Sequence, residues 1–523
     1  MKVVKKSILS LSMLLLSASF VLSGCSEGNS KDSALGSDKP VATKNSGSES
    51  TPATQLKPYK LKLVYPGSTQ ADQVKVQEAM NKILQPKINA TIELMPIDWG
   101  QWDNKANLMI ASREKFDIMF TAQWNGHAVN VSKGAFLPMN DDGLDKYGNL
   151  LKKHGQGIID SLSPTFLEGA KINGKNYAVP TNKELAAQGG VIYRTDIAKE
   201  LNLDMTKVKT IKDLEPILTS VKEKRPDITP LFLRNGDNFN AHYFAQTDAL
   251  GDASIPGVIL KDQDGTKVVL TSDLDRYNET LKITRDFMKK GYINKDAATT
   301  SLGTGEALKA GNVFMVVVSL KPGKDAEMAN GISLQGKLKQ IEMTPKTVST
   351  GETSGSMLGI STTSEDPERA MIFINLLHTD KALNNLLNFG IDGVHYEKVS
   401  DNIIKATDAS KNYNPGSSWM FGNQFLNYIW DTEDPQKWDK FKEFNKDAKK
   451  SPALGFTFNA EPVKTEVAAL VNVGKEFDPP LDTGSVDPEK ILPKYRDKLK
   501  AAGLEKILAE KQKQLDAFLA SKK

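Results

Sequence analysis

The segment from Tyr59 to Phe120 alternates between two hydrophobic periods, and no other feature of the sequence constrains the fold as strongly. Some stretches carry apolar residues at every second position or as a short apolar run, as strands do, and others at spacings of three and four, as on one face of a helix. The stretches with strand character span residues 61–65, 88–94 and 116–120, and those with helical character span residues 76–83 and 102–110. This order predicts a parallel sheet flanked by helices.

Polar and aromatic residues follow each of the three predicted strands. Parallel sheets with this topology bind ligands in the crevice beyond the carboxyl ends of their strands. The residues in this position that we select as candidates for ligand binding are Gln70, Asp98, Trp99, Trp124 and Asn125. Trp102 instead falls on the apolar face of its predicted helix, so we expect it in the core.

Two tryptophans occur in polar, turn-like surroundings. Trp124 precedes Asn125, and Trp419 follows Ser418 and shortly precedes Asn423. Sugars present apolar C–H faces and a rim of hydroxyl groups, so an indole ring beside amides and carboxylates suits them. Because an isolated tryptophan is more often part of a core, a core position is the alternative for each. We add Trp419 and Asn423 to the candidates.

The second half of the chain predicts a further buried strand and a polar turn. Residues 313–318 form an almost continuous apolar run, as expected for a strand buried on both faces, and Ser319 follows it. Residues 232–248 begin as a turn and continue into an aromatic stretch that predicts the start of a helix. We therefore expect Asn235, Asn238 and Ser319 on the second side of a cleft. The segment 488–523 has the pattern of one amphipathic helix.

The N-terminus has the composition of an export signal that ends at the single cysteine. A basic start precedes an apolar run of about 15 residues, Ile8 to Leu22, which is short for a membrane span of about 20 residues. Leu22-Ser23-Gly24-Cys25 resembles the bacterial lipobox, which implies cleavage before Cys25 and a lipid on its sulfur. The alternative is an ordinary signal peptide with an incidental cysteine. Residues 26–57 are rich in Ser, Gly, Thr and Lys and predict a flexible tether.

Composition and motif spacing argue against several other classes of protein function. The net charge of +4 on 523 residues gives no basis for nucleic-acid binding, and a single cysteine allows no internal disulfide. Residues 169–176 and 331–338 approach the P-loop pattern but lack its hydroxyl residue, and no H-E-x-x-H pair occurs. Asp-rich turns at 141–143 and 262–265 fall short of a calcium loop. We expect no cofactor and no metal.

Several stretches resemble, in the same order, the extracellular solute-binding proteins of family 1, which are the carbohydrate-binding components of ABC importers. Residues 172–180 match the pattern y-x-G-k-x-Y-x-v-P of the first crossover between lobes, and residues 191–196 match the l-x-Y-n-x-d that follows. Residues 116–124 match the family's f-D-i-m strand. Residues 359–396 are similar to the helix and the f-G-x-x-G-x-h-Y loop of the LipO-like lipoprotein branch.

The resemblance implies an α/β fold of the periplasmic-binding-protein type II, with two discontinuous lobes, a hinge and a helical C-terminal region. The expected division is a signal peptide at 1–24, a lipidated cysteine and linker at 25–57, lobe 1 at 58–179 with a return segment at 344–400, lobe 2 at 180–343, and a C-terminal helical region at 401–523 that packs mainly on lobe 2.

The resemblance also implies a function without catalysis. The protein would be a monomer, held on the extracytoplasmic face of the cell membrane by the lipid on Cys25. It would capture a carbohydrate, expected to be an oligosaccharide, by closing its lobes, and deliver it to the permease subunits of an ABC transporter. One alternative is a surface-anchored enzyme that degrades polysaccharides. Another is a binding protein of the same fold for peptides or another polar solute.

Overall fold

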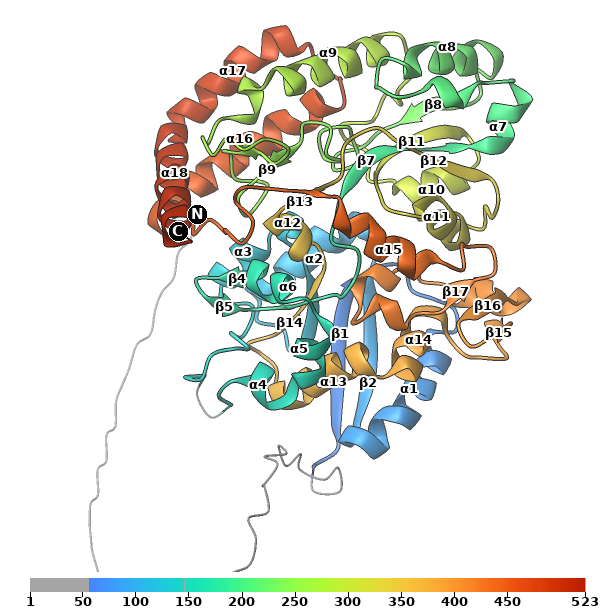
Figure 1. Cartoon of the computed structure of the whole chain (residues 1–523), viewed down its shortest axis with the longest axis vertical. Coiled ribbons are helices and arrows are strands. Elements are labelled where there is room, and N and C mark those ends of the chain that lie inside the picture. Colours follow the sequence, from blue (N-terminus) through green and yellow to red (C-terminus); the bar gives the residue numbers. More distant parts are fainter. Residues whose placement is uncertain (1–55, 145–146, 523) are drawn as a thin grey trace, which may run out of the picture. The chain divides into compact units, whose positions relative to one another are not determined.

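The computed structural model describes residues 56–144 and 147–522, and its first sheet contains the three strands expected near the N-terminus (Figure 1). Five strands lie in the order β2-β1-β3-β14-β6. Their bounds are β1 (Tyr59–Pro66), β2 (Ala90–Ile97), β3 (Ile118–Thr121), β6 (Val179–Pro180) and β14 (Met357–Ile360). β1 pairs in parallel with β2 and with β3, whereas β14 pairs antiparallel with β3 and β6. The predicted parallel βαβαβ unit is confirmed.

Helices cover this sheet because each has one apolar face. They are α1 (Gln73–Ile88), α2 (Trp99–Ala111), α13 (Pro367–Thr379) and α14 (Lys381–Phe389). In α1 the buried residues Val76, Met80, Leu84 and Ile88 recur at intervals of four, which places them on one side of the helix. The helix ends at Asn89, which adopts the left-handed conformation that commonly closes helices.

A tight hairpin precedes the first crossover between the two sheets. Strands β4 (Lys171–Ile172) and β5 (Lys175–Asn176) are joined by Asn173 and Gly174, whose φ angles are 51° and 76°. Two left-handed residues define the type I′ turn that an Asn-Gly pair favours. The chain then crosses from β6 to β7 (Gln188–Arg194).

The second sheet has the order β12-β7-β11-β8, and its central strand is buried on both faces. The other strands are β8 (Thr229–Phe232), β11 (Val313–Leu320) and β12 (Leu338–Glu342). Along β11, Met315 and Val317 belong to one apolar cluster, and Val316 and Val318 belong to another. The apolar run at 313–318 is therefore the doubly buried strand that the sequence predicts. Helices α7 (Thr195–Glu200), α8 (Leu214–Lys224), α10 (Thr304–Lys309) and α11 (Lys324–Ile332) accompany this sheet.

Helix α7 begins at Thr195, and Asp196, within its first turn, accepts hydrogen bonds from the Arg194 side chain. Two local predictions were wrong. Residues 233–246 form turns and no helix. The C-terminal helix is two helices, α17 (Pro488–Ala501) and α18 (Leu504–Ser521), because Gly503 has a φ of 99° and a Cβ there would overlap Glu466.

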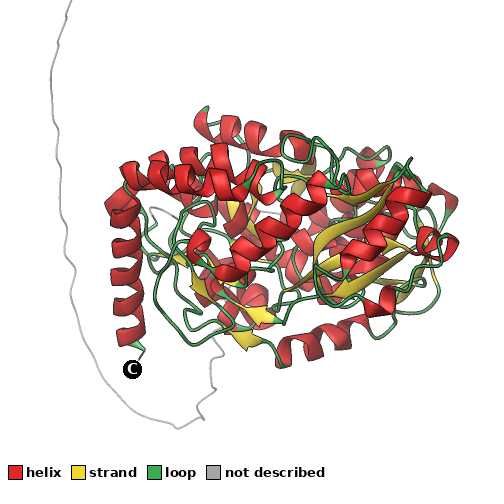
Figure 2. Ribbon diagram, turned by 90° about the horizontal axis from the view of Figure 1, so that it is seen from above, coloured by secondary structure: helices red, strands yellow, loops and turns green. Residues whose placement is uncertain are grey.

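The C-terminal helices form a separate apolar cluster with the middle of the chain. α16 (Lys464–Asp482), α17 and α18 pack with α9 (Asp275–Lys289), and the buried residues of this cluster include Tyr277, Leu281, Leu470 and Leu515. In Figure 2 the last helix before the C-terminus lies at one edge of the molecule. Residues Tyr413, Met420 and Phe421, by contrast, pack in the core of the first sheet. The expected lobe limits, including the one at residue 401, stay a prediction.

Two further stretches connect the parts that carry the two sheets. One contains β13 (Thr347–Val348) and the other contains α15 (Lys437–Lys446) and β18 (Lys449–Lys450), and β13 and β18 pair in parallel. The remaining elements are α3 (His127–Ser132), α4 (Leu150–His154), α5 (Gln156–Ser161), α6 (Pro164–Gly169), α12 (Thr350–Thr353), β9 (Thr247–Asp248), β10 (Ile259–Leu260), β15 (Tyr396–Lys398), β16 (Ile403–Ala406) and β17 (Ile429–Trp430), with short 3-10 turns between them.

The predicted signal peptide, the lipobox with Cys25 and most of the tether lie outside the described residues. Within residues 56–144 and 147–522, no helix combines the length and the apolar character that a bilayer crossing requires.

Candidate functional site

Three tryptophans from distant parts of the sequence meet beside the first sheet. The ring centroid of Trp99 lies 6.3 Å from that of Trp124 and 6.2 Å from that of Trp419, with angles of 27° and 16° between the ring planes. We call these three residues the tryptophan cluster. Trp99 is 38% exposed and Trp124 is 47% exposed, so the cluster presents open indole surface. All three are sequence-predicted site residues, and the structure brings them together.

The parallel strands place this cluster. Trp99 begins α2 directly after β2, and Trp124 follows β3, so both come from the carboxyl ends of strands that flank β1 in the parallel part of the sheet. Phe120 of β3 lies beneath: its ring is 6.1 Å from Trp124 and 5.8 Å from Trp419, the latter edge to face. The Nε1 of Trp124 donates a hydrogen bond of 2.7 Å to the carbonyl oxygen of Gly355, which fixes the orientation of this ring.

A chain of polar groups extends from the cluster along the same edge of the sheet. Asp98, the residue before Trp99, accepts a hydrogen bond of 2.9 Å from the Ser68 hydroxyl. Gln70 donates to the Ser68 carbonyl oxygen, and its Oε1 accepts from the backbone N–H of Asn414 at 3.0 Å. Asp98 and Gln70 are therefore at the edge where the ligand is expected, as the sequence predicts, and Asn414 joins them.

Two other predicted residues, Asn125 and Asn423, have side chains that are already hydrogen-bonded to the protein. Asn125 accepts a hydrogen bond from Trp102 Nε1 at 2.8 Å and donates to Asp103 at 2.9 Å. Asn423 is 8% exposed, and its Oδ1 accepts from the backbone N–H of Phe425. Asn125 thus links two side chains of α2, and Asn423 holds the backbone of the turn that follows it. Trp102 is 2% exposed, as expected for a core residue.

The three predicted residues near the second sheet, Asn235, Asn238 and Ser319, differ in exposure and in hydrogen bonding. Asn235 is exposed at the tip of a turn. Asn238 is 2% exposed, and its Oδ1 accepts from the backbone N–H of Ala241. Ser319, near the end of β11, is hydrogen-bonded to His242 Nδ1 at 2.9 Å. The structure thus brings Ser319, but not the two asparagines, into a side-chain network.

This network forms a Ser319–His242–Asp237 sequence of hydrogen bonds. His242 Nε2 lies 3.1 Å from Asp237 Oδ1, and Asp237 is also paired with Arg234 at 3.3 Å and accepts from Thr304 at 2.7 Å. Burial acts to raise the pKa of Asp237, but the hydrogen bond and charge of His242 and the charge of Arg234 outweigh it and lower the pKa. Asp237 is therefore an anionic anchor for this turn.

The parts of the chain that carry the first and the second sheet come into contact at two places. A Cβ built on Gly100 would lie 3.5 Å from the carbonyl oxygen of Ser301, which precedes α10. A Cβ built on Gly331 of α11 would lie 3.9 Å from the Cα of Gly416. Both distances are those of van der Waals contact. The part that carries the first sheet and the part that carries the second therefore approach each other closely at these two glycines.

Sequence reasoning missed the residues that organise the second side, namely His242, Asp237 and Tyr243. Tyr243 has a φ of 68°, which is uncommon for a bulky residue. Its ring lies 4.1 Å from the Nζ of Lys261, a buried residue that is paired with Glu352 at 3.0 Å. The turn and aromatic signals at 232–248 located this stretch, but its long-range partners have no local signature.

The part of the chain that the structure describes offers no metal site, since no three His, Cys, Asp or Glu side chains within it stand close enough to hold a metal ion. The tryptophan cluster and the polar groups beside it offer stacking against indole rings and hydrogen bonding to a carboxylate and an amide.

Comparisons with known proteins agree with this geometry. The family described as bacterial extracellular solute-binding protein matches residues 78–394, and a domain of unknown function matches residues 452–520. A carbohydrate ABC transporter substrate-binding protein of Streptococcus pneumoniae is 31% identical over 529 residues, which cover 99% of each chain.

Solved structures show the same architecture. The N-glycan transport solute binding protein NgtS of Streptococcus pneumoniae, in complex with Man5GlcNAc, matches with a TM-score of 0.80 at 30% identity over 89% of this chain and 100% of its own. An extracellular solute-binding protein from Bifidobacterium longum subsp. infantis matches at 17% identity with a TM-score of 0.53 over 88% and 99% of the two chains, a likeness of fold alone. The predicted two-lobed α/β fold of type II is confirmed, and the chain belongs to the bacterial extracellular solute-binding proteins.

Proposed function

We propose that the protein captures an oligosaccharide between its lobes and delivers it to an ABC importer. The observation that supports this most directly is the tryptophan cluster, in which Trp99 and Trp124 are exposed at the carboxyl ends of β2 and β3 and the ring of Trp99 is nearly parallel to those of Trp124 and Trp419. Indole faces complement the C–H faces of sugar rings, and several rings in a row suit a ligand of several sugar units. The relative NgtS, whose structure contains Man5GlcNAc, supports the same ligand class.

Hydrogen bonds to the sugar hydroxyls come from both sides in this proposal. Asp98 and Gln70 bind the rim of a sugar stacked on the cluster, while Ser319 and the exposed Asn235 meet it from the second lobe. The predicted residues Asn125, Asn238 and Asn423 support the site from behind, since their side chains already bond to the protein. Mixed stacking and hydrogen bonding is the chemistry that small-molecule sites generally use.

Binding is coupled to closure of the lobes. The close approaches at Gly100 and Gly331 describe the arrangement in which the two sides touch, and a ligand held by both sides favours that arrangement over an open one. The permease would then distinguish the loaded protein by its closed form. No step in this cycle requires bond cleavage or a cofactor.

The N-terminal residues add the location. We propose that Cys25 is lipidated, that the protein is anchored on the extracytoplasmic face of the cell membrane, and that it acts as a monomer. The basic start, the apolar run and Leu22-Ser23-Gly24-Cys25 support the anchor. Two acyl chains give stable anchoring where a single chain is marginal.

A binding panel tests the ligand class. Calorimetry and thermal unfolding of the mature protein with Man1GlcNAc, Man5GlcNAc, kestose and a tripeptide should show binding to at least one oligosaccharide. A ligand at 100 times its Kd stabilises the protein by about 2.7 kcal/mol, which thermal unfolding detects readily. Binding of the tripeptide and of none of the sugars would instead support a peptide-binding protein of the same fold.

The Ser319–His242–Asp237 arrangement favours a second candidate, a hydrolase, because serine, histidine and aspartate in a hydrogen-bonded sequence can activate a nucleophile. Two features make it the weaker candidate. Ser319 pairs with Gly189 inside the β11–β7 ladder, and Asp237 is shared with Arg234 and Thr304. Chromatography of the oligosaccharides after incubation decides: released fragments that disappear with Ser319→Ala would establish the hydrolase.

A further inference from the structure

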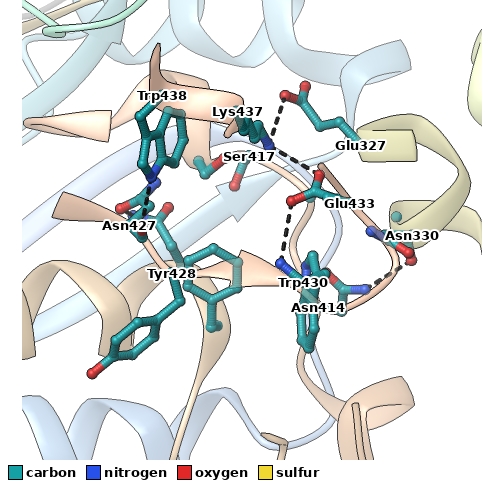
Figure 3. Close-up of a pocket in the computed structure, with 15 residues that line it drawn as sticks. Glu327, Asn330, Asn414, Ser417, Asn427, Tyr428, Trp430, Glu433, Lys437 and Trp438 are labelled. Carbon is teal, nitrogen blue, oxygen red and sulfur yellow. Dashed lines mark hydrogen bonds and ion pairs between the residues drawn. The ribbon is translucent and has the colours of Figure 1, made fainter. Parts of the chain in front are cut away.

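A small, partly open pocket lies where helix α11, which accompanies the second sheet, meets residues 388–438. Its volume is about 30 Å³, and we call it the boundary pocket (Figure 3). Glu327, Asn330 and Gly331 come from α11, and the rest of the lining comes from residues 388–438. Ser418, which lines the pocket, directly precedes Trp419 of the cluster. Asn414, another lining residue, is bonded to Gln70 after β1.

Five side chains that line this pocket have buried polar atoms with no hydrogen-bond partner within residues 56–144 and 147–522. One of these atoms, Glu327 Oε2, is held by ion pairs with Lys321 and Lys437. The other four are neutral: Asn330 Nδ2, Asn388 Oδ1, Ser417 Oγ and Asn427 Nδ2, in residues that are 6%, 3%, 4% and 2% exposed. An unpaired buried polar atom is costly, so four around one pocket indicate a site for a polar group. Two amide donors, one amide acceptor and a hydroxyl suit a group that both donates and accepts.

The charges on the wall are already paired. Lys437 Nζ lies 2.9 Å from Glu433 and 3.9 Å from Glu327, and Glu327 is also 3.0 Å from Lys321 and 2.8 Å from Lys324. Figure 3 shows Lys437 between the two carboxylates. A charged ligand group would gain no free partner here. The pocket therefore suits a neutral group.

Size limits the group further. A volume of about 30 Å³ accommodates about two water-sized groups, which matches one carbon and one oxygen atom and is far too small for a sugar ring. The aromatic residues Phe389, Tyr428, Trp430 and Trp438 also line the pocket, and their rings suit the carbon of such a group.

We propose that the boundary pocket binds one hydroxymethyl group of the oligosaccharide held on the tryptophan cluster. This inference rests on the proposed function and adds a specificity element to it. Because Asn330 comes from the second lobe and Ser417, Asn388 and Asn427 from the segment opposite, a hydroxymethyl group seated there bonds to both sides. The pocket therefore selects sugars that carry this group and couples the selection to lobe closure.

A double-mutant cycle between protein and ligand tests the proposal. The probe is the tightest binder among Man1GlcNAc, Man5GlcNAc and kestose, compared with analogues in which a single primary hydroxyl is replaced by hydrogen. Calorimetry gives Kd values for the wild type, for Ser417→Ala, which keeps the space but removes one hydroxyl, and for Ser417→Val, which fills it. Ser132→Ala, at an exposed position on α3, is the matched control.

For the wild type, the Kd of one analogue should be at least 10 times the Kd of the parent sugar. In Ser417→Ala this ratio of the two Kd values should be at least 3-fold smaller. Ser417→Val should weaken the parent sugar more than this analogue, while Ser132→Ala changes neither, and unfolding temperatures confirm that each variant folds. Equal ratios for every analogue in the wild type and in both Ser417 variants would overturn the proposal and leave the proposed function intact. A wild type that binds none of the three sugars would overturn both.

Discussion

Replacing Trp124 with alanine should separate ligand binding from stability. The ring is 47% exposed and contacts Trp99 and Phe120 at centroid distances of 6.3 and 6.1 Å. If a sugar stacks on it, truncation removes a rigid contact surface of the kind that contributes at least about 2 kcal/mol at binding hot spots. Since 1.4 kcal/mol is a factor of ten, we expect Kd to rise by roughly 30-fold or more.

The cost in stability should be moderate. A fully buried tryptophan loses about 3–5 kcal/mol on truncation to alanine. Nearly half of the Trp124 side chain already contacts solvent, and truncation at the surface leaves no closed cavity, so we expect a loss of about 2 kcal/mol, including the bond to Gly355. In a chain of this length such a loss lowers the unfolding temperature by only a few degrees.

The assay pairs calorimetry with thermal unfolding on three variants. Trp124→Phe keeps an aromatic face and should lose less than 10-fold in affinity. Trp102→Ala is the matched control, because Trp102 is 2% exposed on the neighbouring helix α2 and should lose about 3–5 kcal/mol of stability. A Trp124→Ala protein that binds the sugar within 3-fold of the wild type would refute the stacking role and assign Trp124 to the support of the fold.

Three further predictions follow from the anchor, the hinge and the C-terminal helices. Cys25→Ser should release the protein from the membrane fraction or leave it as an uncleaved precursor; a processed, membrane-bound variant would contradict lipidation. Small-angle scattering should give a smaller radius of gyration with saturating sugar, and Trp124→Ala at the same sugar concentration should keep the larger value; equal radii would argue against closure. Burial and the charge of Asp482 raise the pKa of Asp478 to about 7, against about 3.9 in an unfolded chain. The folded state therefore holds this proton more tightly, and stability falls as pH rises from about 4 to 7. Asp478→Asn should raise the unfolding temperature at pH 8 and leave it unchanged at pH 4; an equal shift at both pH values would show that titration of Asp478 is not the cause.

Much of the fold could be predicted because hydrophobic period is a local property. The strand at 313–318 was recognised from its continuous apolar run, and the helix α1 from spacings of three and four. The predicted helix boundaries were wrong where a tertiary contact determines the end of a helix. Gly503 breaks the C-terminal helix because Glu466 of α16 occupies the space next to it. The sequence of residues 488–523 alone cannot indicate this contact.

The candidate site was predictable in part for a related reason. Residues after parallel strands gather at one edge of a sheet, so Trp99 and Trp124 could be expected to lie near each other. Their stacking with Trp419 depends on how residues 413–421 pack into the first core. Asn423 and Asn238 are polar residues in turns, which the sequence alone does not distinguish from ligand-binding residues, and the structure shows that their side chains bond the backbone of their own turns.

The sequence by itself determined the class of this protein, a two-lobed α/β chain with a signal-like N-terminus. The grounds are its local hydrophobic periodicity, its turn residues and the order of its family-like motifs. The tertiary structure alone decided which side chains share a surface. Across long sequence separations, Trp419 stacks with Trp99, His242 is hydrogen-bonded to Ser319, and Asn330 and Ser417 line one pocket. Such pairs arise when apolar cores pack and bring unrelated segments together, and the polar residues at their margins have no pattern of their own that encodes the partner.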